Sequence, residues 1–476
     1  MNALVRSPRK NLTVLFDFFA LGFRQFGELL VQSFEKAIGF THIGAVFTID
    51  HFCKFVEHRC WSGNNSSLII QEVFGMTSQS IHGLSGWHKL EPIVRLQVTN
   101  PKMANTRMKK THLDTPCLVI DQSKLLHNLK KMQAQVTAKH KALRPHIKTH
   151  KCSVLAKQQI AHGAIGVSAA KVSEALVLAE AGVCHTLITS PIVTDAKCKV
   201  LKQCHTLDPS LIVVCDSAAN AVFLNTAFTD TDRPLHVLVD VDPGVGRTGV
   251  PPEDALKLGQ FITQHCPALS LKGIQCYAGN LQHITDYADR QNASHTVMER
   301  AAALRHDFLH AGLPCGILSG AGTGTYMIDM EVDGVTEVQP GSYTVMDVEY
   351  REIGSKEHAE KFEDFQPAMT LLVTVISANH TTHVTVDAGT KSIYVDANTR
   401  PKIISNPGLR YDLSVFGDEY GKVTAEPGTP LPQVGEVLEL IVPHCEPTIN
   451  LHTQFHITEN DDVVDTWAID MRGCVQ

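Results

Sequence analysis

One short stretch of the chain carries an unusual density of cationic and imidazole side chains. Residues 144–151 read Arg-Pro-His-Ile-Lys-Thr-His-Lys and lie at the end of an apolar run that is typical of a buried strand. A lysine held there among other cations, and partly buried, would have a lowered pKa and could form a Schiff base with an aldehyde. The alternative is a solvated basic loop, because runs of charge usually face water.

A second stretch could hold an anion. Residues 320–325 read Gly-Ala-Gly-Thr-Gly-Thr and follow another apolar run. Alternating glycines let backbone N–H groups approach a phosphate, although a lone glycine loop is more often a plain turn. The spacing matches neither the dinucleotide nor the P-loop signature. A lysine at one strand end and a phosphate cradle at another are the pair that pyridoxal phosphate requires, so we expect that cofactor.

Three further polar stretches follow apolar runs. In the first, residues 242–249, Arg247 could bond a cofactor oxygen while the neighbouring glycines permit close approach. Residues 277–283 and 339–343 each contain a tyrosine with amide side chains nearby. Any one of these stretches by itself could be a surface loop.

His444, Cys445 and Glu446 lie between two prolines, in what reads as an extended segment. In such a segment residues i and i+2 point the same way, so His444 and Glu446 would share a face and Cys445 would point away. An imidazole and a carboxylate on one face suit Zn²⁺, Mn²⁺ or Mg²⁺, with positions left open for a substrate. A simple His–Glu hydrogen bond is the alternative.

The elements that position these residues recur regularly from about residue 113. Apolar runs, typical of strands buried on both faces, occur at 143–147, 165–170, 186–189, 211–215, 235–241, 271–277, 315–319 and 335–338. Segments with helical spacing, such as 172–181 and 255–263, separate them. This alternation predicts an α/β fold, a (β/α)₈ TIM barrel whose active site lies where the strands end. A doubly wound open sheet would show a similar alternation.

The chain divides into an N-terminal extension (1–110), the barrel (111–354) and a C-terminal part (355–476). The helix that precedes the barrel is expected to begin at Ser123 as its N-cap. In the C-terminal part the helical period disappears, and β-branched runs at 371–376, 383–386, 393–395 and 436–442 predict an antiparallel β domain.

The first 110 residues begin with basic residues, are rich in phenylalanine and show no steady period. A basic, acid-poor start is compatible with an organellar targeting segment. We favour a poorly ordered extension, or a translation start at Met103 or Met108.

Composition excludes several functional classes. The chain has 42 Lys and Arg against 49 Asp and Glu, so it lacks the basic footprint of a nucleic-acid-binding protein. No run reaches the ~20 apolar residues that a membrane helix needs, so we expect a soluble protein with no membrane partner. The 13 cysteines include no C-x-x-C pair, which is typical of a reducing compartment, and we expect the cytoplasm.

Taken together, these motifs resemble the D-threonine aldolase and D-serine dehydratase family, fold-type III pyridoxal-phosphate enzymes related to alanine racemase. The likeness runs from about residue 113 to the C-terminus, and its motifs in chain order are Asp114-Thr115-Pro116, 144–151, 239–249, 320–325, 339–343, Val386-Asp387-Ala388-Gly389, Gly417-Asp418-Glu419 and 443–450. The resemblance implies an alanine racemase-like barrel, a D-serine dehydratase-like β domain and a head-to-tail homodimer.

The resemblance also implies roles for individual residues. Lys148 would be the Schiff-base lysine, and the other cofactor contacts would be Arg247, Tyr277, Gly322, Thr323, Gln339 and Tyr343. Alanine racemases have an arginine on the pyridine nitrogen where this chain has Gln339. A neutral glutamine cannot keep that nitrogen free of a proton by repulsion, so chemistry other than racemisation is expected.

The proposed metal motif separates two branches of the family. The dehydratases carry His-x-Cys, whereas the aldolases carry His-Cys-Asp with the histidine and the carboxylate as ligands. Here Glu446 stands in the aspartate position, and the surrounding run looks especially like bacterial 3-hydroxy-D-aspartate aldolases. Asn280 and Tyr420 stand where many relatives have histidine.

These observations predict a lyase that uses pyridoxal phosphate and a divalent metal to cleave β-hydroxy-D-amino acids, giving glycine and an aldehyde or oxoacid. His283, or a metal-bound hydroxide, would remove the β-hydroxyl proton. One alternative is a D-serine dehydratase, which gives pyruvate and ammonia. The other is a pyridoxal-phosphate carrier without catalytic activity, which would need neither the β domain nor the metal pair.

Overall fold

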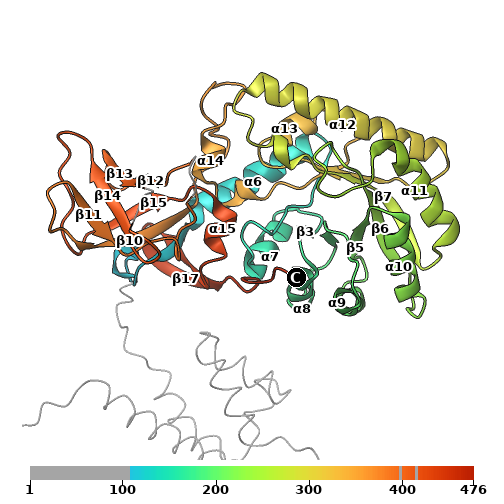
Figure 1. The fold of residues 1–476 in the computed structure, drawn as a ribbon, viewed down its shortest axis with the longest axis horizontal. Coiled ribbons are helices and arrows are strands. Elements are labelled where there is room, and N and C mark those ends of the chain that lie inside the picture. The colour runs from blue at the N-terminus through green and yellow to red at the C-terminus, as the bar shows by residue number, and fades with distance from the viewer. Residues whose placement is uncertain (1–107, 396–398, 413–415) are drawn as a thin grey trace, which may run out of the picture. The chain divides into compact units, whose positions relative to one another are not determined.

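The computed structural model describes residues 108–395, 399–412 and 416–476, and a parallel barrel forms the right-hand part of the ribbon in Figure 1. The expectations for residues 1–107 lie outside this range. Eight parallel strands follow the order β2-β9-β8-β7-β6-β5-β4-β3, and a bridge between His146 and Ser168 closes the ring. The predicted TIM barrel is therefore confirmed. Its strands are β2 (Ala142–Leu143), β3 (Val167–Ala169), β4 (Thr186–Ile188), β5 (Ile212–Cys215), β6 (Leu235–Asp240), β7 (Leu269–Cys276), β8 (Ile317–Gly320) and β9 (Glu337–Val338). Each of them overlaps one predicted run, and β2 shares only Leu143 with its run.

Helices connect the strands around the outside of the barrel. They are α6 (Gln122–Ala138), α7 (Ser153–Ala161), α8 (Val172–Glu180), α9 (Asp195–Leu207), α10 (Ala218–Phe228), α11 (Pro252–His265), α12 (Tyr287–His310) and α13 (Tyr326–Asp329), with short 3₁₀ turns at Lys110–His112, Gly279–Leu281 and Ser342–Thr344. The prediction of Ser123 as an N-cap is wrong. Helix α6 begins at Gln122, because the Asp121 carboxylate accepts the backbone N–H of Lys124 and caps the helix from there.

Side chains of the barrel strands alternate between the helices and the interior. Val213 and Val239 belong to the main core together with residues of the helices. Their neighbours Val214 and Leu238 belong to a small separate cluster that contains strand residues alone. Because a strand has a period of two, the residues two positions further on face the same interior at the carboxyl end of the barrel.

A second sheet lies beside the barrel and is largely antiparallel (Figure 1). Its strands are β1 (Cys117–Asp121), β10 (Met369–Ser377), β11 (His383–Val386), β12 (Lys402–Ile403), β13 (Leu409–Asp412), β14 (Gly421–Ala425), β15 (Val437–Ile441), β16 (Gln454–Glu459) and β17 (Asp462–Ala468). Strand β1 pairs with β10 and β16, so the first described strand joins this sheet and precedes the barrel in sequence.

Three of the four β-branched runs predicted in this region form strands, and the run at 393–395 does not. The backbone N–H groups of Ser392 and Ile393 both donate to Gly389 O, so the chain turns there. Ile393 is fully buried, which accounts for its apolar side chain without a strand.

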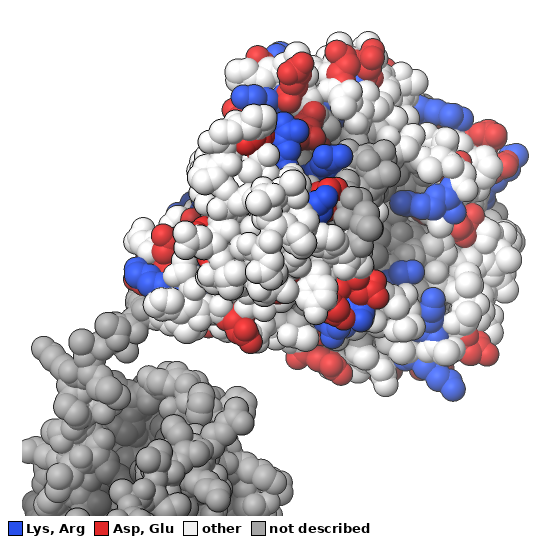
Figure 2. Space-filling view, turned by 60° about the vertical axis from the view of Figure 1, so that its left-hand side comes forward, with Lys and Arg blue, Asp and Glu red and all other residues white. Residues whose placement is uncertain are grey.

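The surface of the described residues mixes both signs of charge. On the face shown in Figure 2, Lys and Arg are interspersed with Asp and Glu. No helix among the described residues is long and apolar enough to cross a membrane.

A buried ion pair lies inside the barrel between β2 and β9. Arg144 Nε and Nη2 lie 2.8 and 3.1 Å from the two carboxylate oxygens of Glu337, and Nη1 donates to His185 O at 2.5 Å. The two side chains are 6% and 3% exposed. Such a pair adds little to the stability of the fold, but removing one partner leaves the other charge buried and unpaired.

We therefore expect Glu337→Leu to lower the free energy of unfolding by about 3–5 kcal/mol, because Arg144 stays buried and charged. Urea unfolding followed by circular dichroism measures the loss. The double variant Arg144→Met with Glu337→Leu should recover much of it, since no charge remains. A single variant as stable as the wild type would contradict this account.

Candidate active site

The basic run that follows β2 forms a folded loop. His146, His150 and Lys151 are 7%, 0% and 8% exposed, whereas the side chain of Lys148 is 40% exposed. The loop is therefore packed and presents one lysine, which rules out a solvated basic segment. A Cβ on Gly341 would lie 2.5 Å from Thr149 Oγ1, so only glycine lets the 339–343 stretch approach this loop.

Lys151 anchors the loop from behind. Its Nζ donates to Glu174 Oε1 at 2.6 Å and to Cys474 O at 3.0 Å. The other Glu174 oxygen accepts the backbone N–H groups of Ala170 and Lys171 at the start of α8. Of the two lysines in the run, Lys151 is structural and Lys148 is the one presented.

The expected lowering of the lysine pKa is wrong in this structure. Lys148 Nζ lies 3.2 Å from Glu446 Oε1, and this carboxylate raises the pKa of Lys148 above its usual value against the opposing effect of burial. For the pKa of Lys148, the cations next to it in sequence have less effect than one carboxylate 298 residues away.

Glu446 lies in α15 (Cys445–Ile449) and is bound by donors from two parts of the barrel. Besides Lys148, its Oε1 accepts Thr149 Oγ1 at 2.9 Å and Ser342 Oγ at 3.0 Å. Burial alone would raise the Glu446 pKa, but Lys148 and His444 outweigh it and hold that pKa well below its usual range. The carboxylate is thus ionised and fixed.

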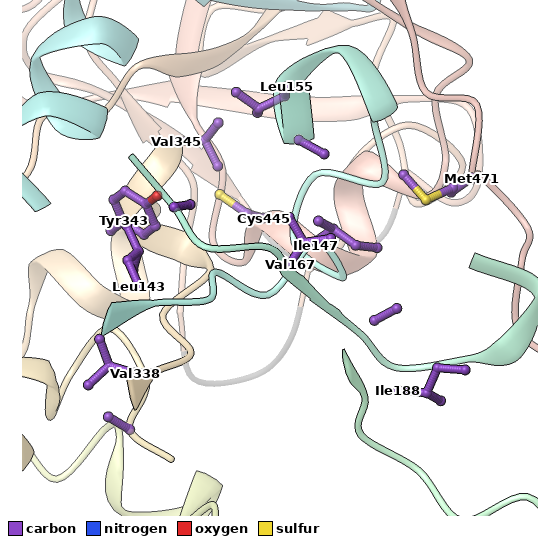
Figure 3. Close-up of a cluster of buried hydrophobic side chains, with 14 of the residues drawn as sticks. Leu143, Ile147, Leu155, Val167, Ile188, Val338, Tyr343, Val345, Cys445 and Met471 are labelled. Carbon is purple, nitrogen blue, oxygen red and sulfur yellow. The ribbon is translucent and has the colours of Figure 1, made fainter. Parts of the chain in front are cut away.

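His444 and Glu446 face each other, although the segment is not extended throughout. His444 is extended at φ −140°, whereas Glu446 is already in helix α15, and His444 Nε2 lies 2.9 Å from Glu446 Oε2. Cys445 points away as expected, and its Sγ donates to Met346 O at 3.3 Å. Figure 3 shows this thiol inside the buried apolar cluster.

Glu349, a residue that the sequence did not indicate, connects the two site histidines. It lies in α14 (Val348–Arg351) and accepts the His444 Nδ1–H at 2.6 Å, while His283 Nε2 lies 3.6 Å from the same oxygen. Burial lowers the pKa of His444, but Glu349 and Glu446 outweigh it and raise that pKa to about 10. Burial lowers the pKa of His283, so its ring is neutral at pH 7.

Backbone pairing joins the helices that carry these residues. Val348 N donates to Val442 O at 3.1 Å and Glu349 N to Pro443 O at 3.2 Å. Asp347 caps α14 through Tyr350 N and also accepts Cys445 N at 3.0 Å. The barrel end and the His444–Glu446 segment therefore form one rigid junction.

The glycine loop is bound closely by Gln282, the residue before His283. A Cβ on Gly322 would lie 2.4 Å from Gln282 Oε1, and Gly324 N donates to that oxygen at 3.0 Å. Thr323 Oγ1 accepts Tyr343 N at 3.1 Å. The sequence offered no sign of the role of Gln282, because its partner lies about forty residues later in the chain.

The remaining predicted residues divide between the barrel mouth and the core. The Arg247 guanidinium lies 5.8 Å from the centre of the Tyr277 ring, so these two are brought together. Gln339 lies inside the barrel and donates to Ser319 and Gln275. Tyr343 is fully buried, its hydroxyl bonded to Gln159, and Figure 3 shows it among apolar side chains. Its contact with a cofactor stays a prediction, to which the structure adds a packing role for the phenol.

The described residues contain no group of three His, Cys, Asp or Glu side chains that could hold a metal ion. The His444–Glu446 pair nevertheless has two features of ligands. Glu446 Oε2 is buried and lies 2.9 Å from His444 Nε2, and the Nδ1–H bond to Glu349 keeps that nitrogen turned toward the carboxylate. The pair fits two coordination positions of a metal ion, if small molecules fill the other coordination positions.

The chain was compared with known proteins. Residues 120–348 match the family "Alanine racemase, N-terminal domain" and residues 368–458 match "Putative serine dehydratase domain". A D-threonine aldolase of Arthrobacter sp is 36% identical over 363 residues, 76% of this chain and 93% of the relative. A 3-hydroxy-D-aspartate aldolase of Paracoccus denitrificans (strain Pd 1222) is 31% identical over 372 residues, 77% and 94% of the two chains. The crystal structure of D-threonine aldolase from Filomicrobium marinum has a TM-score of 0.71 at 32% identity, and the match covers 77% of this chain and 97% of that one.

We expect Gly322→Ala to weaken pyridoxal-phosphate binding, because the new Cβ displaces Gln282 and the loop with it. Overpacking of this kind costs about 1–3 kcal/mol, or roughly a 5- to 150-fold rise in Kd. Titration of the cofactor-free protein, followed by absorbance, measures it. Gly316→Ala is the matched control, since its Cβ would meet only Lys272 O at 3.9 Å. Equal affinities of both variants would argue against a tight cradle.

The pH dependence of stability should report the His444 contacts. The folded-state pKa of about 10 exceeds the usual 6.5, so the stabilisation is complete below pH 6.5 and is lost as the pH rises through 10. Each pH unit between these limits removes about 1.4 kcal/mol at most, and less because the ring is partly exposed. Urea unfolding of cofactor-free, chelator-treated protein measures the slope. His444→Gln should flatten it, and an unchanged slope would contradict the assignment.

Proposed function

The chain belongs to the fold-type III pyridoxal-phosphate family of D-threonine aldolases and D-serine dehydratases, and from this premise we propose that it is a carbon–carbon lyase. It cleaves β-hydroxy-D-amino acids, D-threonine or 3-hydroxy-D-aspartate, to glycine and an aldehyde or oxoacid. One observation carries the proposal: Lys148, His444 and Glu446 meet at the barrel mouth, with Lys148 Nζ 3.2 Å and His444 Nε2 2.9 Å from the Glu446 carboxylate.

The residues at the barrel mouth fit pyridoxal phosphate. Lys148 has an accessible amine, and Gly322 and Thr323 belong to the glycine loop that follows β8, where a barrel can hold a phosphate. Arg247, Tyr277 and Gln339 would contact the ring, and Tyr343 would support it from the core. When bound, the cofactor supplies an electron sink for the negative charge left at Cα when the Cα–Cβ bond breaks.

His444 and Glu446 would bind the divalent metal, Zn²⁺, Mn²⁺ or Mg²⁺, which would lower the pKa of the substrate β-hydroxyl. Glu349 keeps the His444 ring in the orientation and tautomer that a ligand needs, through the 2.6 Å bond at Nδ1. Thr149 and Ser342 fix the Glu446 carboxylate from the barrel side.

His283 has the properties of the general base. Burial lowers its pKa, so the ring is neutral and able to accept the β-hydroxyl proton near pH 7. It packs against Tyr350 with ring centres 4.4 Å apart, and its centre lies 6.5 Å from that of His444. The base and the proposed ligand thus lie close together on either side of the Glu349 carboxylate oxygen.

The dehydratase alternative is favoured less by this geometry. In that branch a thiolate two residues after the histidine is the second ligand, whereas this chain has Glu446 there. Cys445 cannot substitute, since its thiol is buried and bonded to Met346 O. A carrier without activity would need neither the fixed carboxylate nor Glu349.

We further propose a homodimer in a reducing compartment, the cytoplasm. The cysteines of the described residues are all free, and burial raises the pKa of most of them, as expected of thiols used as small apolar side chains. Sedimentation of the purified chain tests the dimer.

A substrate panel tests the proposed function. Protein reconstituted with pyridoxal phosphate and a divalent metal should release glycine from D-threonine or 3-hydroxy-D-aspartate, and chelation should suppress it. His283→Ala should lower kcat by about 10²–10⁴-fold. Lys148→Ala should remove the absorbance of lysine-bound cofactor, whereas Lys257→Ala, on the exposed face of α11, is the control. Pyruvate from D-serine without glycine from the other substrates would instead establish the dehydratase.

A further inference from the structure

Four polar side chains form a layer inside the barrel at the carboxyl ends of β6 to β9. Asp240, Gln275 and Ser319 lie in register on neighbouring strands, and Gln339 directly follows β9. They are 4%, 3%, 0% and 3% exposed. Asp240 comes two residues after Leu238 of the interior cluster, so on β6 the layer lies next to the apolar filling of the barrel.

The side chains of the layer form a continuous series of hydrogen bonds, in which each amide donates toward Asp240. Asp240 accepts Thr248 Oγ1 at 3.0 Å on one oxygen and Gln275 Nε2 at 2.9 Å on the other. Gln275 Oε1 in turn accepts Gln339 Nε2 at 3.2 Å, and that amide also donates to Ser319 Oγ at 2.7 Å. Gln339 is held at its backbone too, where its N–H donates to Gly320 O at 2.8 Å.

The direction of this series follows from its carboxylate end. An ionised carboxylate only accepts, so Gln275 must turn its NH₂ group to Asp240 and its carbonyl to Gln339. Gln339 must then turn its NH₂ group to Gln275, and both of its amide hydrogens are used. Among the described residues no hydrogen bond reaches Gln339 Oε1, so this oxygen is the group that remains for a ligand.

We propose that Gln339 presents its carbonyl oxygen to the pyridine nitrogen of the cofactor and holds that nitrogen protonated, with Asp240 and Gln275 as positioning residues. The inference rests on the proposed function, in which Gln339 contacts the cofactor ring, and on the resemblance, which puts Gln339 where alanine racemases have an arginine on the pyridine nitrogen. An arginine there can only donate and keeps the nitrogen unprotonated, whereas an oriented carbonyl can only accept. A protonated ring withdraws more charge from Cα, which suits cleavage of a Cα–Cβ bond.

The charge on Asp240 is available near neutral pH. Burial raises its pKa to about 6, while its hydrogen bonds to Gln275 and Thr248 oppose that rise. Asp216 raises the same pKa and Arg247 lowers it, so these are the charges that face the carboxyl group. Above pH 6 the carboxylate therefore sets the direction of both amides.

Nuclear magnetic resonance of holoenzyme loaded with ring-¹⁵N pyridoxal phosphate tests the proposal. At pH 8 the wild-type protein should show the chemical shift of a protonated pyridine nitrogen. Gln275→Met keeps the side-chain volume but breaks the series of hydrogen bonds, and Asp240→Asn keeps the side-chain shape but removes the charge. Both should therefore move the ¹⁵N chemical shift toward that of the unprotonated pyridine. Asp216→Asn is the matched control, because it removes a nearby charge that takes no part in these hydrogen bonds.

A free-base shift in the wild-type holoenzyme overturns the proposal. An unchanged shift in both Gln275→Met and Asp240→Asn overturns the role of the two positioning residues, as does an equal displacement in Asp216→Asn. Failure of the proposed function looks different: the labelled cofactor then does not attach to Lys148, or no glycine is released from any of the β-hydroxy-D-amino acids.

Discussion

The site depends on one buried carboxylate, that of Glu446. Its Oε1 accepts hydrogen bonds from Lys148 and Thr149 of the loop after β2 and from Ser342 after β9. Its Oε2 faces His444. A buried carboxylate is costly unless donors surround it, so the barrel and the C-terminal segment must keep their relative positions for this group to stay paired. The same interaction that fixes the junction thus presents the lysine and the histidine to one space.

The surrounding structure makes that junction stiff. Asp347 joins α14 to the backbone of Cys445, and Glu349 reaches from α14 to both histidines. Beneath it, the side chains of Asp240, Gln275, Ser319 and Gln339 form a polar layer at the carboxyl end of the barrel. The polar layer is ordered because each amide has a single orientation compatible with its neighbours, and this ordering starts from the Asp240 carboxylate.

Much of the fold was predictable because it depends on local pattern. Each of the eight apolar runs overlaps a barrel strand, and the turn signals after residue 355 predicted the antiparallel sheet. The errors have tertiary causes. The N-cap is Asp121 and not Ser123, and in the run at 393–395 Ile393 is buried at a turn where the run pairs with no strand. Apolar periodicity reports burial, and burial alone does not distinguish a strand from a packed turn.

By itself the sequence determined which chemical groups are available and at which strand ends they lie: a lysine, a glycine loop, an arginine, and a histidine and a carboxylate two residues apart. The tertiary structure alone decided how these groups behave. It paired Lys148 with Glu446 and so raised a pKa that the neighbouring cations were expected to lower, and it bonded both amide hydrogens of Gln339 to Gln275 and Ser319. The reason is that Coulomb interactions and hydrogen bonds act over a few ångströms in space, and the partners that decide them here are as many as 298 residues apart in the chain.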